Sequence, residues 1–322
     1  MPGIIVQSYY FSIGTIYQIT FSIFISFFCE IIGIKLCNYS IKKHIKNYSW
    51  VITATLIALS IPPLSPWWMV ACGTFFAIFI AKYIYGGLGE NIFNPAMTGY
   101  AILLISFPIQ IAQWINLKQL QNIDFNYVEI LKTIFIKNDL FILFIKNKYS
   151  NLIELTQATP LDLIKTKIFT ETMNNQTEFI NHKQFIKNNP WIWINIAYCF
   201  GGLLLILFKI INWRIPTIIL VIIITLSLIS WNINPNKYMH PLIHMFSGST
   251  MIGVFFIATD PVTSTTNKYG LYIYTSIIGF LIWIIRTYSN YPDSIAFAIL
   301  LSNSLVPIIN YYIFPKTYGH KK

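Results

Sequence analysis

The residues best suited to chemistry lie in the segment Glu154–Asp162, which reads Glu-Leu-Thr-Gln-Ala-Thr-Pro-Leu-Asp. It combines hydroxyl groups with carboxylates, and hydroxyls can be esterified or can hydrogen-bond a polar ligand. Thr159 is the candidate for modification, because it follows a small residue and precedes Pro160. A proline disfavours helical geometry at the residue before it, so Thr159 is predicted to lie in accessible extended or turn backbone. Taken alone, the segment is more typical of an ordinary polar loop.

A second candidate site begins with the glycine-rich run Gly86–Gly89 and continues with Glu90, Asn91 and Asn94. The run lacks the Lys-Ser/Thr of a P-loop and the preceding strand of a dinucleotide fingerprint. Glycines instead let irregular backbone run close to its neighbours, and such backbone at membrane depth is tolerated when it is buried in protein or lines a cavity. The pattern favours a broken helix that binds an ion or a polar ring; the alternative is a plain turn.

A third candidate is the donor–acceptor cluster around Asp260, formed with Thr263, Thr265 and Asn267. Hydroxyls and amides at this density can bind a partly dehydrated cation or the polar edge of a ring. Asp260 is alternatively a helix-end group or a partner of Lys268. Outside residues 117–190 the chain has only four acids, and any cation that crosses it would depend on them. They are Glu30, Glu90, Asp260 and Asp293.

The composition indicates a membrane protein. Of 322 residues, 55% are hydrophobic and 10% are charged, whereas soluble domains have about 25% charged residues. The net charge of +11 does not indicate nucleic-acid binding, because the basic residues stand at the ends of apolar runs, where they set membrane orientation. The four cysteines have no metal-binding spacing, and no hydrolytic arrangement of Ser, His and Asp is present, so we assign no metal ligands and no catalytic residues.

Apolar runs separated by polar loops predict the transmembrane segments, each of which needs about 20 residues when it crosses alone. The lysine-rich loop after residue 34 marks the cytoplasmic side, and counting crossings then puts residues 117–190 in the periplasm. Residues 1–12 form a first helix that is shorter than expected. The predicted spans are Thr15–Ile34, Trp50–Ile61, Met69–Tyr85, Thr98–Trp114, Trp191–Ile211, Ile215–Trp231, Pro241–Thr259, Leu271–Ile285 and Ile295–Phe314.

The two halves of the chain resemble each other. Pro95 leads into Ala101–Leu104, and Pro292 leads into Ala298–Leu301 with the same offset of 197 residues. Five spans in each half is an odd number, so the halves must face opposite ways, as in many transporters. We expect an all-α polytopic membrane protein of about ten transmembrane helices, built as an inverted five-plus-five repeat. Its parts are a first membrane half (residues 1–116), a periplasmic insertion that carries Thr159 (117–190) and a second membrane half (191–322).

Four stretches together are specific to one family. They are Ala58-Leu-Ser-Ile-Pro-Pro-Leu-Ser-Pro-Trp-Trp-Met69, Tyr85-Gly-Gly-Leu-Gly-Glu-Asn-Ile-Phe-Asn-Pro-Ala-Met97, Phe256-Ile-Ala-Thr-Asp-Pro-Val-Thr-Ser-Thr-Thr-Asn-Lys268 and Thr156-Gln-Ala-Thr159. The chain resembles the D subunits of Rnf-type ion-translocating oxidoreductase complexes and the related B subunits of sodium-translocating NADH:quinone reductases. It departs from them at Ile153, where the family's attachment motif usually has an aspartate six positions before its threonine.

The resemblance implies a function. It implies FMN attached through its phosphate to Thr159, with Thr156 in the same motif, and a second, non-covalent flavin such as riboflavin near the two polar clusters. It also implies a multi-pass subunit of the bacterial inner membrane that couples electron transfer to sodium or proton translocation, with membrane, flavoprotein and iron–sulfur partner subunits. The chain would be part of a translocase and not a stand-alone enzyme. The alternatives are a flavin-free transporter or channel with an inverted repeat, and a scaffold that only positions other subunits.

Overall fold

The structure, a computed structural model, describes residues 1–115, 127–135, 156–157, 159–166, 189–235, 238–289, 291 and 293–313. Predictions that concern Ile153, Glu154, Pro292 or most of the insertion lie outside these residues.

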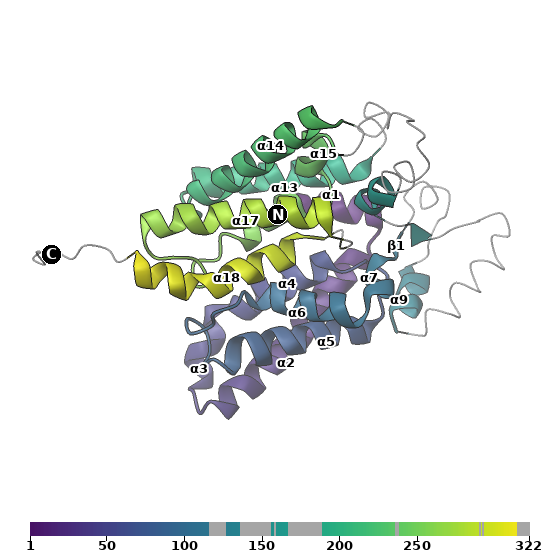
Figure 1. Cartoon of the computed structure of the whole chain (residues 1–322). Helices are drawn as coiled ribbons and strands as arrows, with labels where there is room; N and C mark the ends of the chain where they lie inside the picture. Colours follow the sequence, from purple (N-terminus) through teal and green to yellow (C-terminus); the bar gives the residue numbers. More distant parts are fainter. Residues whose placement is uncertain are drawn as a thin grey trace, which may run out of the picture.

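Helices that lie side by side make up the described chain (Figure 1). The first half contains α1 (Pro2–Phe11), α2 (Gly14–Leu36), α3 (Ile41–His44), η1 (Ile45–Asn47), α4 (Ser49–Ser60), α5 (Trp67–Ile78), η2 (Phe79–Tyr83), α6 (Pro95–Ser106), α7 (Pro108–Ala112) and β1 (Trp114–Ile115). The insertion contributes α9 (Tyr127–Phe135) and β2 (Thr156–Gln157). The second half contains α13 (Pro190–Leu207), α14 (Arg214–Ile233), α15 (Pro241–Phe246), α16 (Thr250–Ile252), η3 (Gly253–Ile257), α17 (Lys268–Tyr288) and α18 (Ile295–Tyr312).

Five of the described helices are long and apolar enough to cross a membrane, namely α2, α13, α14, α17 and α18. Shorter apolar helices occupy residues 49–60, 67–83 and 95–106. These segments coincide with predicted spans, so the all-helical, multi-pass character is confirmed. The total of about ten transmembrane helices stays a prediction.

Two predicted spans are not continuous helices. In the span Thr98–Trp114, α6 ends at Ser106 and α7 begins at Pro108; Phe107 cannot continue the helix easily because a proline follows it. In the span Pro241–Thr259, the chain breaks at residues 247–249, where Gly248 has a φ of +60°. Asn195 of α13 fills this break, donating to the carbonyls of Phe246 and Gly248 at 3.1 and 3.0 Å.

Two helices end in a π-helical turn. The helix α5 continues into η2, and α16 continues into η3. Turns of this kind are rare in proteins, and those that do occur are often found at functional sites. The first carries Lys82 and leads to the glycine-rich run, and the second leads to Asp260.

The helix α9 of the insertion lies at one end of the bundle, with α7 and β1, while α3 lies at the opposite end (Figure 1). The strand β2 pairs antiparallel with β1, and Thr156 is in register with Ile115. In α9, Ile130 and Ile134 are buried, and the helix packs against α2.

Close packing of α5 against α6 depends on Gly73 and Gly99. A Cβ added at Gly99 would lie 2.3 Å from the carbonyl oxygen of Gly73. Membrane helices gain little from apolar burial against one another and associate through such close contacts of small residues.

We expect Gly99→Ala to separate α5 from α6 and to lower the free energy of unfolding by about 3 kcal/mol, the upper range for overpacking. Unfolding of the detergent-solubilised protein measures this. The control is Ile105→Ala on the same helix, where the side chain is 61% exposed and the expected change is about 0.5 kcal/mol or less. Equal effects of the two substitutions would contradict the packing argument.

Candidate functional site

Thr159 caps a short helix formed by residues 160–166. Its hydroxyl donates to Oδ2 of Asp162 at 2.7 Å and accepts the backbone N–H of the same residue at 3.3 Å. The side chain is half-buried and the residue itself is not helical, as the following proline predicts. The structure therefore presents one oriented, partly accessible hydroxyl bound to one carboxylate.

The capped helix is anchored on the second half of the chain. Leu161 and Ile164 are buried against Met239 and Ile243. At its other end, Lys165 donates to the carbonyls of Ser289 and Tyr291, at 3.1 and 2.9 Å, just after α17. Since cations near a helix C-terminus complement its partial negative charge, Lys165 fixes the segment to α17.

The charges of this segment influence each other. Burial raises the pKa of Asp162, and Asp293 raises it further, while hydrogen bonds from Thr159 and the charge of Lys165 oppose the shift. Burial, with the charge of Arg286, lowers the pKa of Lys165 to about 8. Asp162 is therefore a stronger base than an exposed aspartate.

Beneath the segment, Asp293 joins elements of both halves. It accepts hydrogen bonds from Tyr100 of α6 at 2.8 Å and from Ser249 of the helix break at 2.9 Å. Arg286 is buried, with only 1% of the residue exposed. Its guanidinium donates to the carbonyl of His244 at 2.6 Å, and to the hydroxyls of Thr250 and Ser294. Arg286 thus satisfies carbonyl and hydroxyl oxygens left at the break.

The cluster around Asp260 also joins the two halves. Asn94 caps α6, and its amide nitrogen lies 3.4 Å from both Oδ2 of Asp260 and the carbonyl oxygen of Ile257. Asp260 also accepts a hydrogen bond from Thr263 at 3.2 Å. Burial raises the pKa of Asp260, against the hydrogen bonds from Val262 and Thr263. Two sites predicted separately from the sequence are therefore parts of one contact.

The remaining candidates do not take part in this contact. Asn91 is buried and bonds within its own turn, to the backbone of Gly89 and Phe93. Glu90 is exposed, and Asn267 caps α17 while donating to the carbonyl of Ile313 at 2.8 Å. Thr265 is buried, and its hydroxyl has no hydrogen-bond partner in the described parts of the chain.

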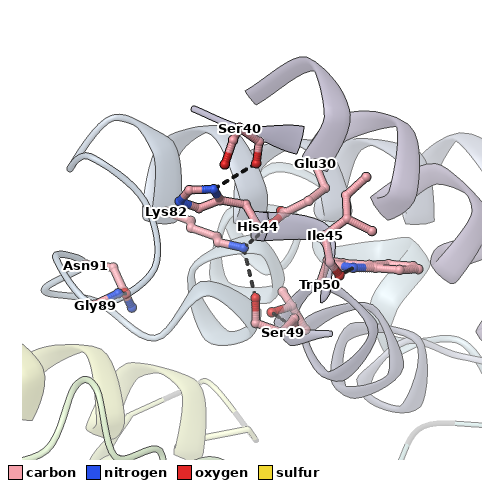
Figure 2. A network of polar contacts seen from close by, with 10 residues as sticks. Glu30, Ser40, His44, Ile45, Ser49, Trp50, Lys82, Gly89 and Asn91 are labelled. Atoms are coloured by element: carbon pink, nitrogen blue, oxygen red, sulfur yellow. Dashed lines mark hydrogen bonds and ion pairs between the residues drawn. The ribbon is translucent and has the colours of Figure 1, made fainter. Parts of the chain in front are cut away.

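A buried ion pair lies where α2, α4 and η2 meet (Figure 2). Glu30 and Lys82 are 2% and 4% exposed, and their charged atoms are 2.5 Å apart. Lys82 also donates to the hydroxyl of Ser49 at 2.9 Å. Glu30 therefore points inward to η2.

A sequence profile of the NQR2, RnfD, RnfE family matches residues 1–319. The chain belongs to this family. It is 41% identical over 323 residues to the D subunit of the ion-translocating oxidoreductase complex of Pectobacterium atrosepticum, covering 100% of this chain and 92% of that protein. It is 46% identical over 323 residues to the protein of the same name from Buchnera aphidicola subsp. Acyrthosiphon pisum, covering 99% and 92%. The corresponding protein of Shewanella frigidimarina is 42% identical over 327 residues, covering 100% and 91%.

In this family member, sequence reasoning missed the partner of each key group. Lys82 lies in what the sequence predicts to be an apolar span, although a lysine within such a run is itself a signal, because intramembrane charges are costly and must be paired. Asp162 closes the segment Glu154–Asp162, but its hydrogen bond to Thr159 follows only from the turn of helix between them.

We expect Lys82→Met to lower the free energy of unfolding by about 3–5 kcal/mol, since it leaves the Glu30 carboxylate buried and unpaired. The double variant Glu30→Gln, Lys82→Met should recover part of that loss, because both charges are gone. A double-mutant cycle in detergent measures the coupling. Purely additive losses would show that the two side chains do not interact.

Proposed function

We propose that this chain is the membrane subunit of an ion-translocating electron-transport complex, corresponding to the D subunit of its relatives, and that FMN is esterified to Thr159. The observation that carries the proposal is the presentation of Thr159. Its half-buried hydroxyl is bonded to Asp162 on a helix anchored to α17, in a chain 41–46% identical to proteins named as D subunits of ion-translocating oxidoreductase complexes.

The residues around Thr159 fit a phosphoester. A primary requirement is a hydroxyl that a transferase can reach, and Thr159 is not fully buried. The ammonium of Lys165 and the guanidinium of Arg286 add positive charge close to the segment, which favours an attached phosphate. When bound, the flavin supplies reversible electron transfer, and the protein supplies its position and electrostatic surroundings. The tether at Thr159 keeps the carrier from diffusing away.

The inverted five-plus-five repeat and the ten spans are part of this proposal. Equivalent neighbours recur in the packing: α2 contacts α4 and α5, and α14 contacts α15 and α17. Likewise α5 contacts α6, and α17 contacts α18. Between the halves, α1 contacts α13 and α6 contacts α18. In each of these two pairs, the helices occupy the same position in the proposed repeat. Such pairing is expected of two related halves.

Buried polar groups along the α6–α18 contact support a cation route, for sodium or protons. At one end, Asp260 contacts Asn94. In the orientation of the Asn303 amide in which its nitrogen donates to the carbonyl of Ile299, its oxygen accepts the backbone N–H of Asn94 at 3.0 Å. Six residues further along α6, about 9 Å at 1.5 Å per residue, Tyr100 contacts Asp293. Polar groups at this depth are costly and mark ion pathways in membrane proteins.

A second, non-covalent flavin such as riboflavin is proposed at the Asp260 end. The polar groups available there come from both halves and include Glu90, Asn91, Asn94, Asp260, Thr263, Thr265 and Asn267. The hydroxyl of Thr265, buried without a partner among the described residues, fits a group that a ligand would satisfy, because buried polar groups are normally hydrogen-bonded.

The proposed place of the chain is the bacterial inner membrane, with the end that carries α3 in the cytoplasm and Thr159 in the periplasm. The positive loop that includes Lys42 and Lys46 supports this orientation. Its partners would be the other membrane, flavoprotein and iron–sulfur subunits of the complex. The rival function, a flavin-free transporter or channel, predicts no flavin on the purified protein, and a scaffold predicts electron flow that does not depend on Thr159.

Thr159→Ala is expected to remove all covalent flavin, because the esterified oxygen is gone. Protein co-expressed with a flavin transferase is denatured and scored by in-gel fluorescence and by the mass of the peptide that contains Thr159. The matched control is Thr166→Ala, which removes an exposed hydroxyl on the same short helix but outside the motif, and this variant should stay fluorescent. Fluorescence that survives Thr159→Ala would refute the assignment.

Asp260→Asn is expected to slow ion transport by the assembled complex about tenfold, the effect of losing about 1.4 kcal/mol of cation binding. Complex assembly should be unchanged, since an asparagine keeps the hydrogen bond to Thr263. Transport is measured in proteoliposomes, with Ser264→Ala as the neighbouring control. Normal transport by Asp260→Asn would exclude this residue from the route.

A further inference from the structure

The hydroxyl of Thr159 is bonded in an unusual way for a helix cap. A capping threonine normally accepts a backbone N–H two or three residues on, and Thr159 does so with Asp162. In addition, the hydroxyl proton points at the carboxylate of the same residue, at an oxygen–oxygen distance of 2.7 Å. This distance is in the range of a charge-assisted O–H···O⁻ bond. The cap itself needs only the first bond.

Esterification of Thr159 has a chemical requirement that this second bond meets. A threonine hydroxyl is a weak nucleophile at neutral pH and is activated by an adjacent general base. A phosphodiester forms when its oxygen attacks the phosphorus of a flavin phosphoanhydride donor. The Oγ1–P bond forms, the anhydride P–O bond breaks, a nucleoside monophosphate leaves, and the hydroxyl proton must go to a base.

We infer that Asp162 is this base, and that it orients the Thr159 hydroxyl and accepts its proton during flavin attachment. The inference rests on the proposed function of Thr159. It assigns to the target chain a role that would otherwise belong to the transferase alone. It also bears on Ile153, which stands where the attachment motif usually has its aspartate, since Asp162 supplies a carboxylate at the hydroxyl.

The neighbouring titratable groups are engaged elsewhere. Lys165 donates to the backbone carbonyls after α17, and Asp293 is bonded to Tyr100 and Ser249. Burial of Asp162 raises its pKa, with a contribution from Asp293 and against Thr159 and Lys165, and this makes the carboxylate a better proton acceptor. Among the described residues, Asp162 is the carboxylate that touches Thr159.

The test follows the rate of flavin attachment to the full-length protein in detergent, using purified transferase and its flavin dinucleotide donor. Asp162→Asn keeps the backbone N–H and an oxygen that accepts the hydroxyl, but removes the basicity. General-base catalysis contributes about 10²–10⁴-fold, so attachment should slow about 100-fold or more. Asp162→Glu should recover part of the rate. The readouts are in-gel fluorescence and the mass of the Thr159 peptide.

A pH profile separates proton transfer from structure. The wild-type rate should fall as the pH is lowered through the pKa of Asp162. This fall is the acid limb of the profile, and Asp162→Asn should lack the limb. Lys165→Gln loosens the anchor but keeps the carboxylate, so it should keep the limb. Attachment to Asp162→Asn at the wild-type rate, or with an unchanged limb, overturns the inference. If the wild type itself takes up no flavin, the proposed function fails instead.

Discussion

The arrangement of the two halves depends on the polar contact that Asn94 makes at the start of α6. There Asn94 caps its own helix, reaches Asp260 across the interface with its side chain and places its backbone N–H beside Asn303 of α18. Apolar burial does little to fix such a register in a membrane, because lipid is as apolar as the side chains. Polar groups that must be satisfied fix it more strictly, since each mismatch would leave one of them unpaired. Asn94, together with Tyr100 further along the helix, thereby helps to set how α6 lies against the second half.

The sequence predicts the helices well and their interruptions poorly. Apolar runs such as Ile215–Trp231 identify a membrane helix because no other structure satisfies its backbone in lipid. The break at Gly248 is not predictable in this way, since Ser247 and Ser249 are compatible with a helix and the break depends on Asn195, which is distant in sequence. The proline after Phe107 is a local signal of interruption, and the apolar residues on both sides obscure it.

At the candidate site, the residue types were predictable and their partners were not. Thr159, Asn94 and Asp260 stand in recognisable local patterns, but the contact between the last two spans the halves of the chain. The pairing of Glu30 with Lys82 depends on η2, where a π-helical turn alters the face on which a side chain emerges. A lysine assigned by ordinary helical periodicity would therefore be placed on the wrong face.

The segment around Thr159 is tied to both halves at once. On one side of Thr159, β2 pairs with β1 at the end of the first half; on the other, the helix of residues 160–166 is held by Lys165 to the end of α17. Few residues separate the two ties, so there is little slack between them. Any rocking of one half against the other would pull directly on the backbone at Thr159. The segment would then act as a tensioned link, through which such a movement changes the position of the Thr159 side chain.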